Sequence, residues 1–374
     1  MKKLSRQDLY DILYGCTILG TGGGGDLKKG LSLIEKALDA GKEFNLVNLE
    51  ELPDDALIAC PYMCGSISPL SEEDEKKYAD LPRIKEEPVL RAYKVMEEYI
   101  GKKFYGVIST ELGGANTALA FYVAALSGNY IVDADPAGRS VPELQHSTFF
   151  INKLPINPMA VANEFGDVVI VKDVVDDFRA ETLVRSMAVV SKNSVGVVDH
   201  LAKGKELKKG VIPGAISYAL KIGKAYRKAK EEDNDLASEI AKTGNGYILF
   251  KGRVKNFQWE DKDGFTIGNA YIKGEDDYFG SEYKIWFKNE NIIAWRDQNI
   301  DITVPDLICM ICDDKKEPLT NPNYEIGMKV SVIGLPAPKE WRTDEGLKIF
   351  GPRHFGYNIE YVPIEKCFKK ERIK

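Results

Sequence analysis

The stretch from Lys103 to Asp135 constrains the fold more than any other part of this chain. An apolar run (KFYGVIST, residues 103–110) precedes a segment with a small-residue start and a glycine stop (GGANTALAFYVAALSG, 113–128), and a second apolar run (NYIVDAD, 129–135) follows. The pattern predicts a strand, a helix and a strand within about 30 residues, which is the size of a βαβ unit. Such crossovers give parallel strands buried under helices, so we expect an α/β domain.

Length and a change of pattern along the chain predict two domains. A chain of 374 residues is too long for one comfortable core. The irregular segment 154–167, with two prolines, predicts a boundary between an N-terminal α/β domain (1–168) and a C-terminal α+β domain (169–374). The second domain is expected to be helical at first, mainly over 212–242. It should become β-rich from about residue 246, where period-2 runs such as YILFKGRV and YKIWFKNENIIAWR begin.

Composition narrows the partners and the compartment. The formal net charge of −6 and the pI near 5.5 argue against nucleic acid or an anionic membrane as the main partner, because both need a basic surface. No run of about 18 apolar residues occurs, so no transmembrane span is expected. The six cysteines are scattered, as in proteins of a reducing compartment. We expect a cytoplasmic protein that binds a small-molecule substrate, as a monomer or a homo-oligomer.

Two glycine-rich segments precede predicted helices. LGTGGGGD (19–26) lies between two amphipathic segments, with Asp26 at a helix N-cap position, and ELGGANT (111–117) opens the helix of the βαβ unit. Free backbone N–H groups at such helix starts suit an anion or a developing oxyanion. A Rossmann fingerprint would have to follow a strand, and a Walker loop would need Lys-Ser/Thr, so neither nucleotide motif is satisfied. The substrate-binding candidates here are Gly22, Gly23, Gly24, Gly25, Asp26, Gly113, Gly114 and Asn116.

Three carboxylates are expected to meet at one edge of the predicted sheet. Glu111 follows the first strand of the βαβ unit, and Asp133 and Asp135 end the second. Ligands of open parallel sheets bind beyond the carboxyl ends of the strands. These acids are therefore candidates for a catalytic base or a metal ligand, with Arg139 as an orienting cation and Glu143 as a substrate-binding residue. The alternative is that the acids cap helices and pair with Arg139 to brace the crossover.

Histidines add one further candidate. His146 is near the acidic edge, and it joins Asp133 and Asp135 as a candidate ligand of a divalent metal, the cofactor that such a cluster would hold. His200 and His354 are expected to make ordinary polar contacts. The identity of the metal, and whether one is needed, stay open at this point.

Six segments, in this order, resemble a family named after S-methyl thiohydantoin desulfurase. They are LYGCTILGTGGGGDLKKG, STELGGANTALA, IVDADPAGRSVPELQ, FKNENIIAW, VPDLIC and GPRHFGY, and the resemblance runs from about residue 9 to 363. It implies an N-terminal and a C-terminal domain and a cytoplasmic, hydantoinase-related hydrolase that cleaves a carbon–sulfur bond, giving a hydantoin and a thiol.

Three functions stay open beside one another. In the hydrolase, Asp133 or Asp135 would be the base or metal ligand, Glu111 its partner and Arg139 an orienter. The alternative is a non-catalytic small-molecule-binding subunit or regulator of a hydantoinase-like system. A third, ATP-dependent activity is suggested by the glycine loop alone.

Overall fold

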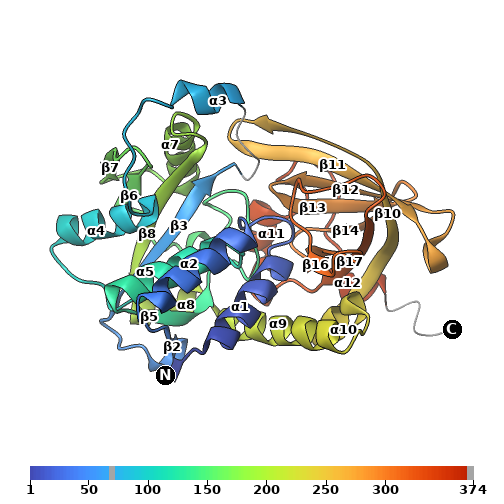
Figure 1. The fold of residues 1–374 in the computed structure, drawn as a ribbon, viewed down its shortest axis with the longest axis horizontal. Coiled ribbons are helices and arrows are strands. Elements are labelled where there is room, and N and C mark those ends of the chain that lie inside the picture. The colour runs from blue at the N-terminus through green and yellow to red at the C-terminus, as the bar shows by residue number, and fades with distance from the viewer. Residues whose placement is uncertain (67–71, 369–374) are drawn as a thin grey trace.

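The computed structural model describes residues 1–66 and 72–368 and consists of two domains side by side, each built on one sheet (Figure 1). The N-terminal part of the chain forms a mixed sheet with helices on both faces, and the C-terminal part forms an antiparallel sheet. These features confirm the expected fold class.

Parallel strands form the middle of the N-terminal sheet. Within the described ranges its strands are β1 (Lys2–Lys3), β2 (Asn45–Asn48), β3 (Leu57–Gly65), β4 (Gly106–Val107), β5 (Tyr130–Asp135), β6 (Met159–Ala162), β7 (Val168–Val171), β8 (Ser194–Lys203) and β9 (Ile212–Pro213). Their order is β1-β2-β5-β4-β3-β8-β6-β7, with β9 beside β5. The pairs β2–β5, β5–β4 and β4–β3 are parallel, and the other pairs are antiparallel. The predicted βαβ unit is confirmed, because α5 (Asn116–Ser127) joins the parallel strands β4 and β5.

Helices cover this sheet because its strands are apolar on both faces. Alternate strand residues such as Ala59 and Ile131 face one core, and Ile58 and Val132 face the other. The first core is covered by α1 (Arg6–Leu19), α2 (Leu27–Asp39), α4 (Pro88–Ile100), α5 and α9 (Ala215–Glu231), and the second by α6 (Thr148–Ile151), α7 (Asp177–Val189) and α8 (Gly204–Gly210). The remaining short elements of this half are α3 (Glu72–Lys77) and the 3-10 turn η1 (Leu49–Glu51).

Helix caps place the glycine loop. Ser5 starts α1 with a capping box, in which its Oγ accepts from the Asp8 N–H at 3.1 Å and the Asp8 carboxylate accepts from the Ser5 N–H at 3.2 Å. Asp26 is the N-cap of α2, as predicted, and its carboxylate accepts from the Lys28 N–H at 2.6 Å. The loop 20–26 therefore runs between two fixed helix ends.

The C-terminal sheet is antiparallel throughout. Its described strands are β10 (Tyr247–Lys262), β11 (Phe265–Gly274), β12 (Glu282–Lys288), β13 (Glu290–Arg296), β14 (Asn299–Thr303), β15 (Leu307–Cys312), β16 (Glu317–Pro318) and β17 (Lys329–Leu335), in the order β14-β13-β12-β11-β10-β17-β15-β16. The helical stretch predicted over 212–242 is in fact β9 and two helices, because Asp235 caps a second start at α10 (Leu236–Thr243). The other elements are η2 (Asp276–Tyr278), η3 (Lys339–Arg342), α11 (Asp344–Phe350) and α12 (Ile364–Cys367).

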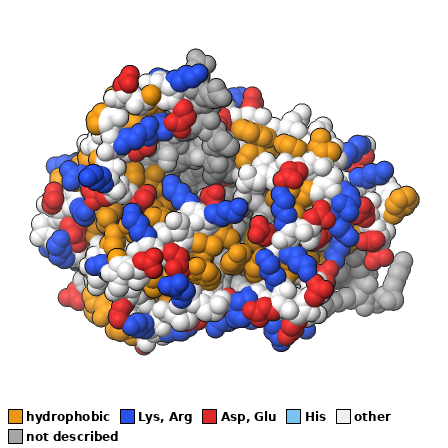
Figure 2. All heavy atoms as spheres, viewed as in Figure 1, with side chains coloured by type: hydrophobic (Ala, Val, Ile, Leu, Met, Phe, Trp, Pro, Cys, Tyr) orange, Lys and Arg blue, Asp and Glu red, His pale blue; other side chains and the backbone are white. Residues whose placement is uncertain are grey.

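A continuous apolar core joins the two domains. The cluster that contains Leu9 and Ile12 of α1 continues into Cys309 and Ile311 of β15. Helix α9 packs along α1 at the base of this junction (Figure 1). On the face drawn in Figure 2, Lys and Arg side chains are interspersed with Asp and Glu.

Candidate functional site

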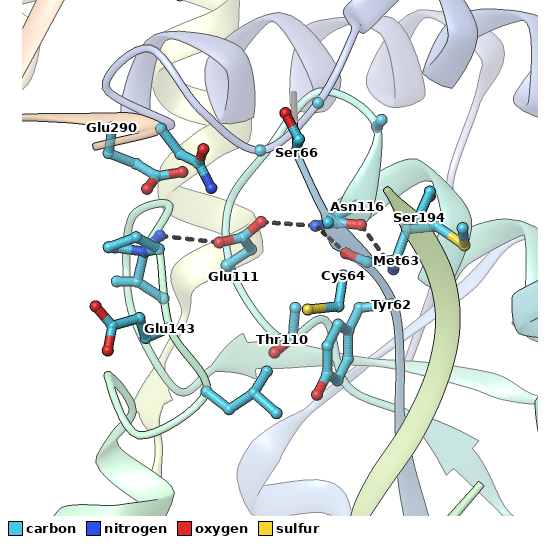
Figure 3. Close-up of a pocket in the computed structure, with 18 of the residues that line it drawn as sticks. Tyr62, Met63, Cys64, Ser66, Thr110, Glu111, Asn116, Glu143, Ser194 and Glu290 are labelled. Carbon is cyan, nitrogen blue, oxygen red and sulfur yellow. Dashed lines mark hydrogen bonds between the residues drawn. The ribbon is translucent and has the colours of Figure 1, made fainter. Parts of the chain in front are cut away.

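A cavity of about 220 Å³ is lined by segments of both domains. Its walls come from the glycine loop, the end of β3, the loop after β4, the start of α5, the loop after β5 and the β12–β13 hairpin (Figure 3). The sequence-predicted residues that line it are Gly24, Gly25, Asp26, Glu111, Asn116, Glu143 and His146. The structure therefore brings together half of the predicted set in one place.

Glu111 is held in the cavity wall by two donors. The Asn116 side-chain amide donates to Oε1 at 2.7 Å, and the Val141 backbone N–H donates to Oε2 at 2.9 Å (Figure 3). The side chain is buried, and burial raises the pKa of Glu111 although both hydrogen bonds favour the charged form. Its position just past β4 is the one predicted from the βαβ pattern.

Glu290 is a second buried carboxyl group in the same cavity (Figure 3). It begins β13 directly after Asn289, whose φ of 59° makes the hairpin turn. Among the described residues, Glu290 Oε2 has no hydrogen-bond partner. Burial, and then the nearby charge of Glu111, raise the pKa of Glu290 well above its usual range. Of the two carboxyl groups, Glu290 is thus the one that its surroundings keep protonated more strongly.

Sequence reasoning missed Glu290. Glu290 lies in the segment KNEN, which falls within the predicted period-2 run YKIWFKNENIIAWR and forms the turn between the paired strands β12 and β13. The one sequence feature that points to Glu290 is its place as a charged residue at the start of the apolar segment ENIIAW. Charged residues at such places usually lie in solvent-exposed turns, so the feature is weak.

The glycine loop lies close against the backbone of the second glycine-rich segment, at the start of α5. Gly22, Gly24 and Gly25 have φ of 97°, 76° and 81°, which are conformations that glycine adopts without steric cost. A Cβ at Gly24 would lie 2.3 Å from the Cα of Gly113, so these two glycine segments touch directly. Two backbone N–H groups of these segments are already used in hydrogen bonds within the protein. The Gly23 N–H donates to the Gly20 carbonyl oxygen at 2.8 Å, and the Gly113 N–H donates to Thr117 Oγ1 at 3.1 Å.

Other predicted loop residues lie just behind the lining. A Cβ at Gly22 would be 2.4 Å from Asn321 Nδ2, and one at Gly114 would be 2.7 Å from Thr17 Oγ1. Neither residue contributes to the described cavity surface, and their predicted contact with substrate stays a prediction.

Asp133 and Asp135 lie outside the cavity lining of the described chain. Asp133 accepts from the N–H of Ser217 at 2.9 Å and from its hydroxyl at 2.5 Å, near the start of α9. Asp135 Oδ1 accepts from the Gly138 N–H at 2.6 Å, and burial raises the pKa of this fully buried group to about 8. These contacts are of the helix-capping and turn-bracing kind that the sequence left as the alternative.

Arg139 joins the two domains. Its guanidinium donates to the carbonyl oxygens of Pro305 and Asp306, both at 3.1 Å, and to Thr21 Oγ1 at 2.7 Å. It also packs 5.0 Å from the centre of the Phe350 ring. The side chain is fully buried, burial lowers its pKa to about 10, and it does not line the described cavity.

A cluster of Glu143, His146 and His354 lies at the cavity wall. Their ligand atoms are all within 4.8 Å of one another. The Nε2 atoms of His146 and His354 are 2.9 Å apart, and the Glu143 carboxylate is paired with the Lys288 ammonium. Burial lowers the pKa of His146 to about 3. Burial opposes ionisation of Glu143, but His146 and Lys288 outweigh it and lower the pKa of Glu143 to about 2.

Comparison with known proteins places the chain in a family. Residues 7–173 match the family model described as S-Me-THD-like, N-terminal domain, and residues 175–364 match S-Me-THD-like, C-terminal domain. The chain belongs to the S-Me-THD-like family. This confirms the resemblance to S-methyl thiohydantoin desulfurase that the six sequence segments indicated. No curated protein matches the chain.

One solved structure supports the fold of this S-Me-THD-like protein. It is the crystal structure of a protein from Chromobacterium violaceum, 22% identical, with a TM-score of 0.76 over 97% of this chain and 100% of that one. At that identity the likeness concerns the fold alone. None of the helices in the described ranges is long and apolar enough to cross a membrane.

Proposed function

We propose that this S-Me-THD-like protein is a hydrolase that acts on a hydantoin- or thiohydantoin-like ring and cleaves the C–S bond at C2, giving a hydantoin and a thiol. The observation that carries the proposal is the pair of buried carboxyl groups, Glu111 from one domain and Glu290 from the other, in one cavity. The cavity volume of about 220 Å³ is below the roughly 300–1,000 Å³ of sites for drug-sized ligands. A cavity of this size suits a five-membered ring.

The two carboxyl groups suit opposite tasks in this reaction. Glu111 accepts two hydrogen bonds that favour its charged form, so it is the proposed base that takes a proton from water. Glu290 is the proposed acid, because its environment favours the protonated form.

The step balances with water as the second reactant. The water oxygen bonds to C2 as its proton passes to Glu111, and Glu290 protonates the ring nitrogen of the C=N bond. The new hydroxyl then returns a proton to Glu290 as the carbonyl forms and the C–S bond breaks. Glu111 gives its proton to the departing thiolate, so both carboxyl groups end as they began.

Polar groups around the cavity suit recognition of such a ring. Asn116, Arg185 and Asp26 also line it. Arg185 is positioned by an ion pair with Glu181 at 2.7 Å and by a hydrogen bond to the Pro142 carbonyl at 3.1 Å. These contacts and a third to the Gly264 carbonyl use three of its five N–H donors, and the other donors suit an oxygen of the ring or of its substituent.

The test is thiol release from a panel of S-methyl thiohydantoins. We expect turnover by the wild type and losses on the order of 10²–10⁴-fold in Glu111→Gln and Glu290→Gln. Glu282→Gln, which removes an exposed carboxylate of β12, is the matched control and should keep wild-type turnover.

Two outcomes would overturn the proposal. Wild-type turnover in both folded cavity variants would remove the carboxyl pair from the chemistry. Binding of hydantoins without thiol release from any member of the panel would instead support the non-catalytic binding subunit.

A further inference from the structure

Two histidines from distant parts of the chain point their ring nitrogens at each other beside the cavity. His146 follows β5 and His354 follows α11, 208 residues later, and their Nε2 atoms are 2.9 Å apart. Only one of the two can supply the proton of that hydrogen bond. Apolar rings pack beside this pair, since Phe350 and Phe355 lie 5.0 and 5.6 Å from the His146 ring centre.

The third member makes this pair a donor set for a metal ion. Glu143 brings a carboxylate oxygen within 4.8 Å of one ring nitrogen of each histidine. Two imidazoles and one carboxylate are the protein ligands of a common class of zinc site, with bonds of about 2.0–2.2 Å. Ligand atoms around a tetrahedral ion of that size are about 3.3 Å apart, so small side-chain rotations suffice. Burial lowers the pKa of both histidines, which keeps their nitrogens unprotonated and able to bind a cation.

Glu143 accepts from Gln145 at one carboxylate oxygen and from Lys288 at the other, and Lys288 is the charged partner that a metal ion would have to replace. Its ammonium is paired with Glu143 and lies 4.1 Å from the centre of the Phe265 ring. The cation–π contact with Phe265 can still hold the ammonium when the Glu143 carboxylate binds a metal ion instead. A like charge this close weakens cation binding, and its removal should therefore strengthen it.

We propose that Glu143, His146 and His354 form a binding site for a divalent cation of the Zn²⁺ type. Glu143 and His146 also line the cavity, so the proposed site borders it. The site differs from the predicted one, because it uses His146 with Glu143 and His354 in place of Asp133 and Asp135. It does not depend on the proposed hydrolysis, since binding is measured without substrate.

The test is calorimetric titration of the chelator-treated full-length protein with Zn²⁺, together with the visible absorption of added Co²⁺. We expect one ion per chain at micromolar concentration and a Co²⁺ spectrum typical of four-coordinate sites. His146→Ala and His354→Ala should each weaken binding by at least about tenfold, since each removes one of three ligands. His354 is only half-buried, so its variant tests the site even if the His146 variant fails to fold.

Lys288→Met provides the opposite test. It should tighten Zn²⁺ binding by about tenfold, because it removes a competing positive charge from the carboxylate. Absence of Zn²⁺ binding by both the wild type and Lys288→Met would overturn the proposal and leave the cluster as an internal ion pair beside a histidine pair. Undiminished binding by a folded His354→Ala would overturn it as well.

Discussion

Replacement of Gly23 by alanine should disable Glu290 while leaving the fold intact. A Cβ at Gly23 would lie 1.7 Å from Glu290 Oε1 and 2.5 Å from its Cδ. Gly23 is not among the described residues with a positive φ, so alanine fits the backbone itself. The three atoms nearest to the new methyl group all belong to the Glu290 side chain, which borders the cavity and can move into it.

The size of the displacement sets the expected loss. Ordinary contact begins near 3.4 Å, so the carboxylate must move by about 1.7 Å. A misplacement of about 1 Å in a catalytic group can cost on the order of 10²-fold in rate, and loss of a general acid about 10²–10⁴-fold. We therefore expect Gly23→Ala to lower thiol release by at least about 10²-fold, with a melting temperature near that of the wild type.

A double-mutant cycle tests whether Glu290 carries the effect. If Gly23→Ala acts through Glu290, its combination with Glu290→Gln should be no worse than Glu290→Gln alone. Gly41→Ala is the control. Gly41 has a φ of 70° and no atom within 4 Å of an added Cβ, so alanine there strains the backbone but contacts no other side chain. Multiplicative losses in the double variant, or full turnover by a folded Gly23→Ala, would show that Gly23→Ala does not act by displacing Glu290.

Two further predictions concern residues that the sequence placed at the site. The pKa of Asp135 is about 8 in the fold and 3.8 as its ordinary value, so ionisation opposes folding and stability should fall as pH rises between these values, by up to about 1.4 kcal/mol per pH unit. Asp135→Asn should flatten this fall in urea titrations at several pH values and keep the specific activity. A steeper fall of stability with pH in Asp135→Asn, or loss of activity in the folded variant, would contradict this prediction. Arg139→Lys should lower the free energy of unfolding by about 2–4 kcal/mol, because lysine cannot reach all the carbonyl oxygens that Arg139 serves. Unchanged stability with lost substrate affinity would instead support the orienting role.

Local patterns predicted the central part of the N-terminal fold. The N-cap of α2 and the βαβ unit both depend on residues close in sequence, and the structure has both of them. The break between α9 and α10 was missed because both helices share one amphipathic pattern, and a single cap at Asp235 decides where the second begins.

The site was harder to predict because it forms between distant segments. Glu111 follows from the end of a strand, whereas Glu290 reaches the same cavity from the other domain. His354 is unremarkable in its own segment and becomes a partner of His146 only through packing 208 residues away. Asp133 and Asp135 were predicted at the site because they end a strand. In the structure Asp133 accepts a hydrogen bond near the start of α9, and Asp135 accepts one within a turn.

The most direct measurement of the central claim is hydrolysis of an S-methyl thiohydantoin in water enriched in the heavy oxygen isotope. We expect one heavy oxygen in the C2 carbonyl of the hydantoin product, one thiol released per hydantoin formed, and loss of both in Glu290→Gln. Thiol release without heavy oxygen at C2 would contradict attack by water. Binding of the ring with neither product would show that the cavity holds the ligand without cleaving it.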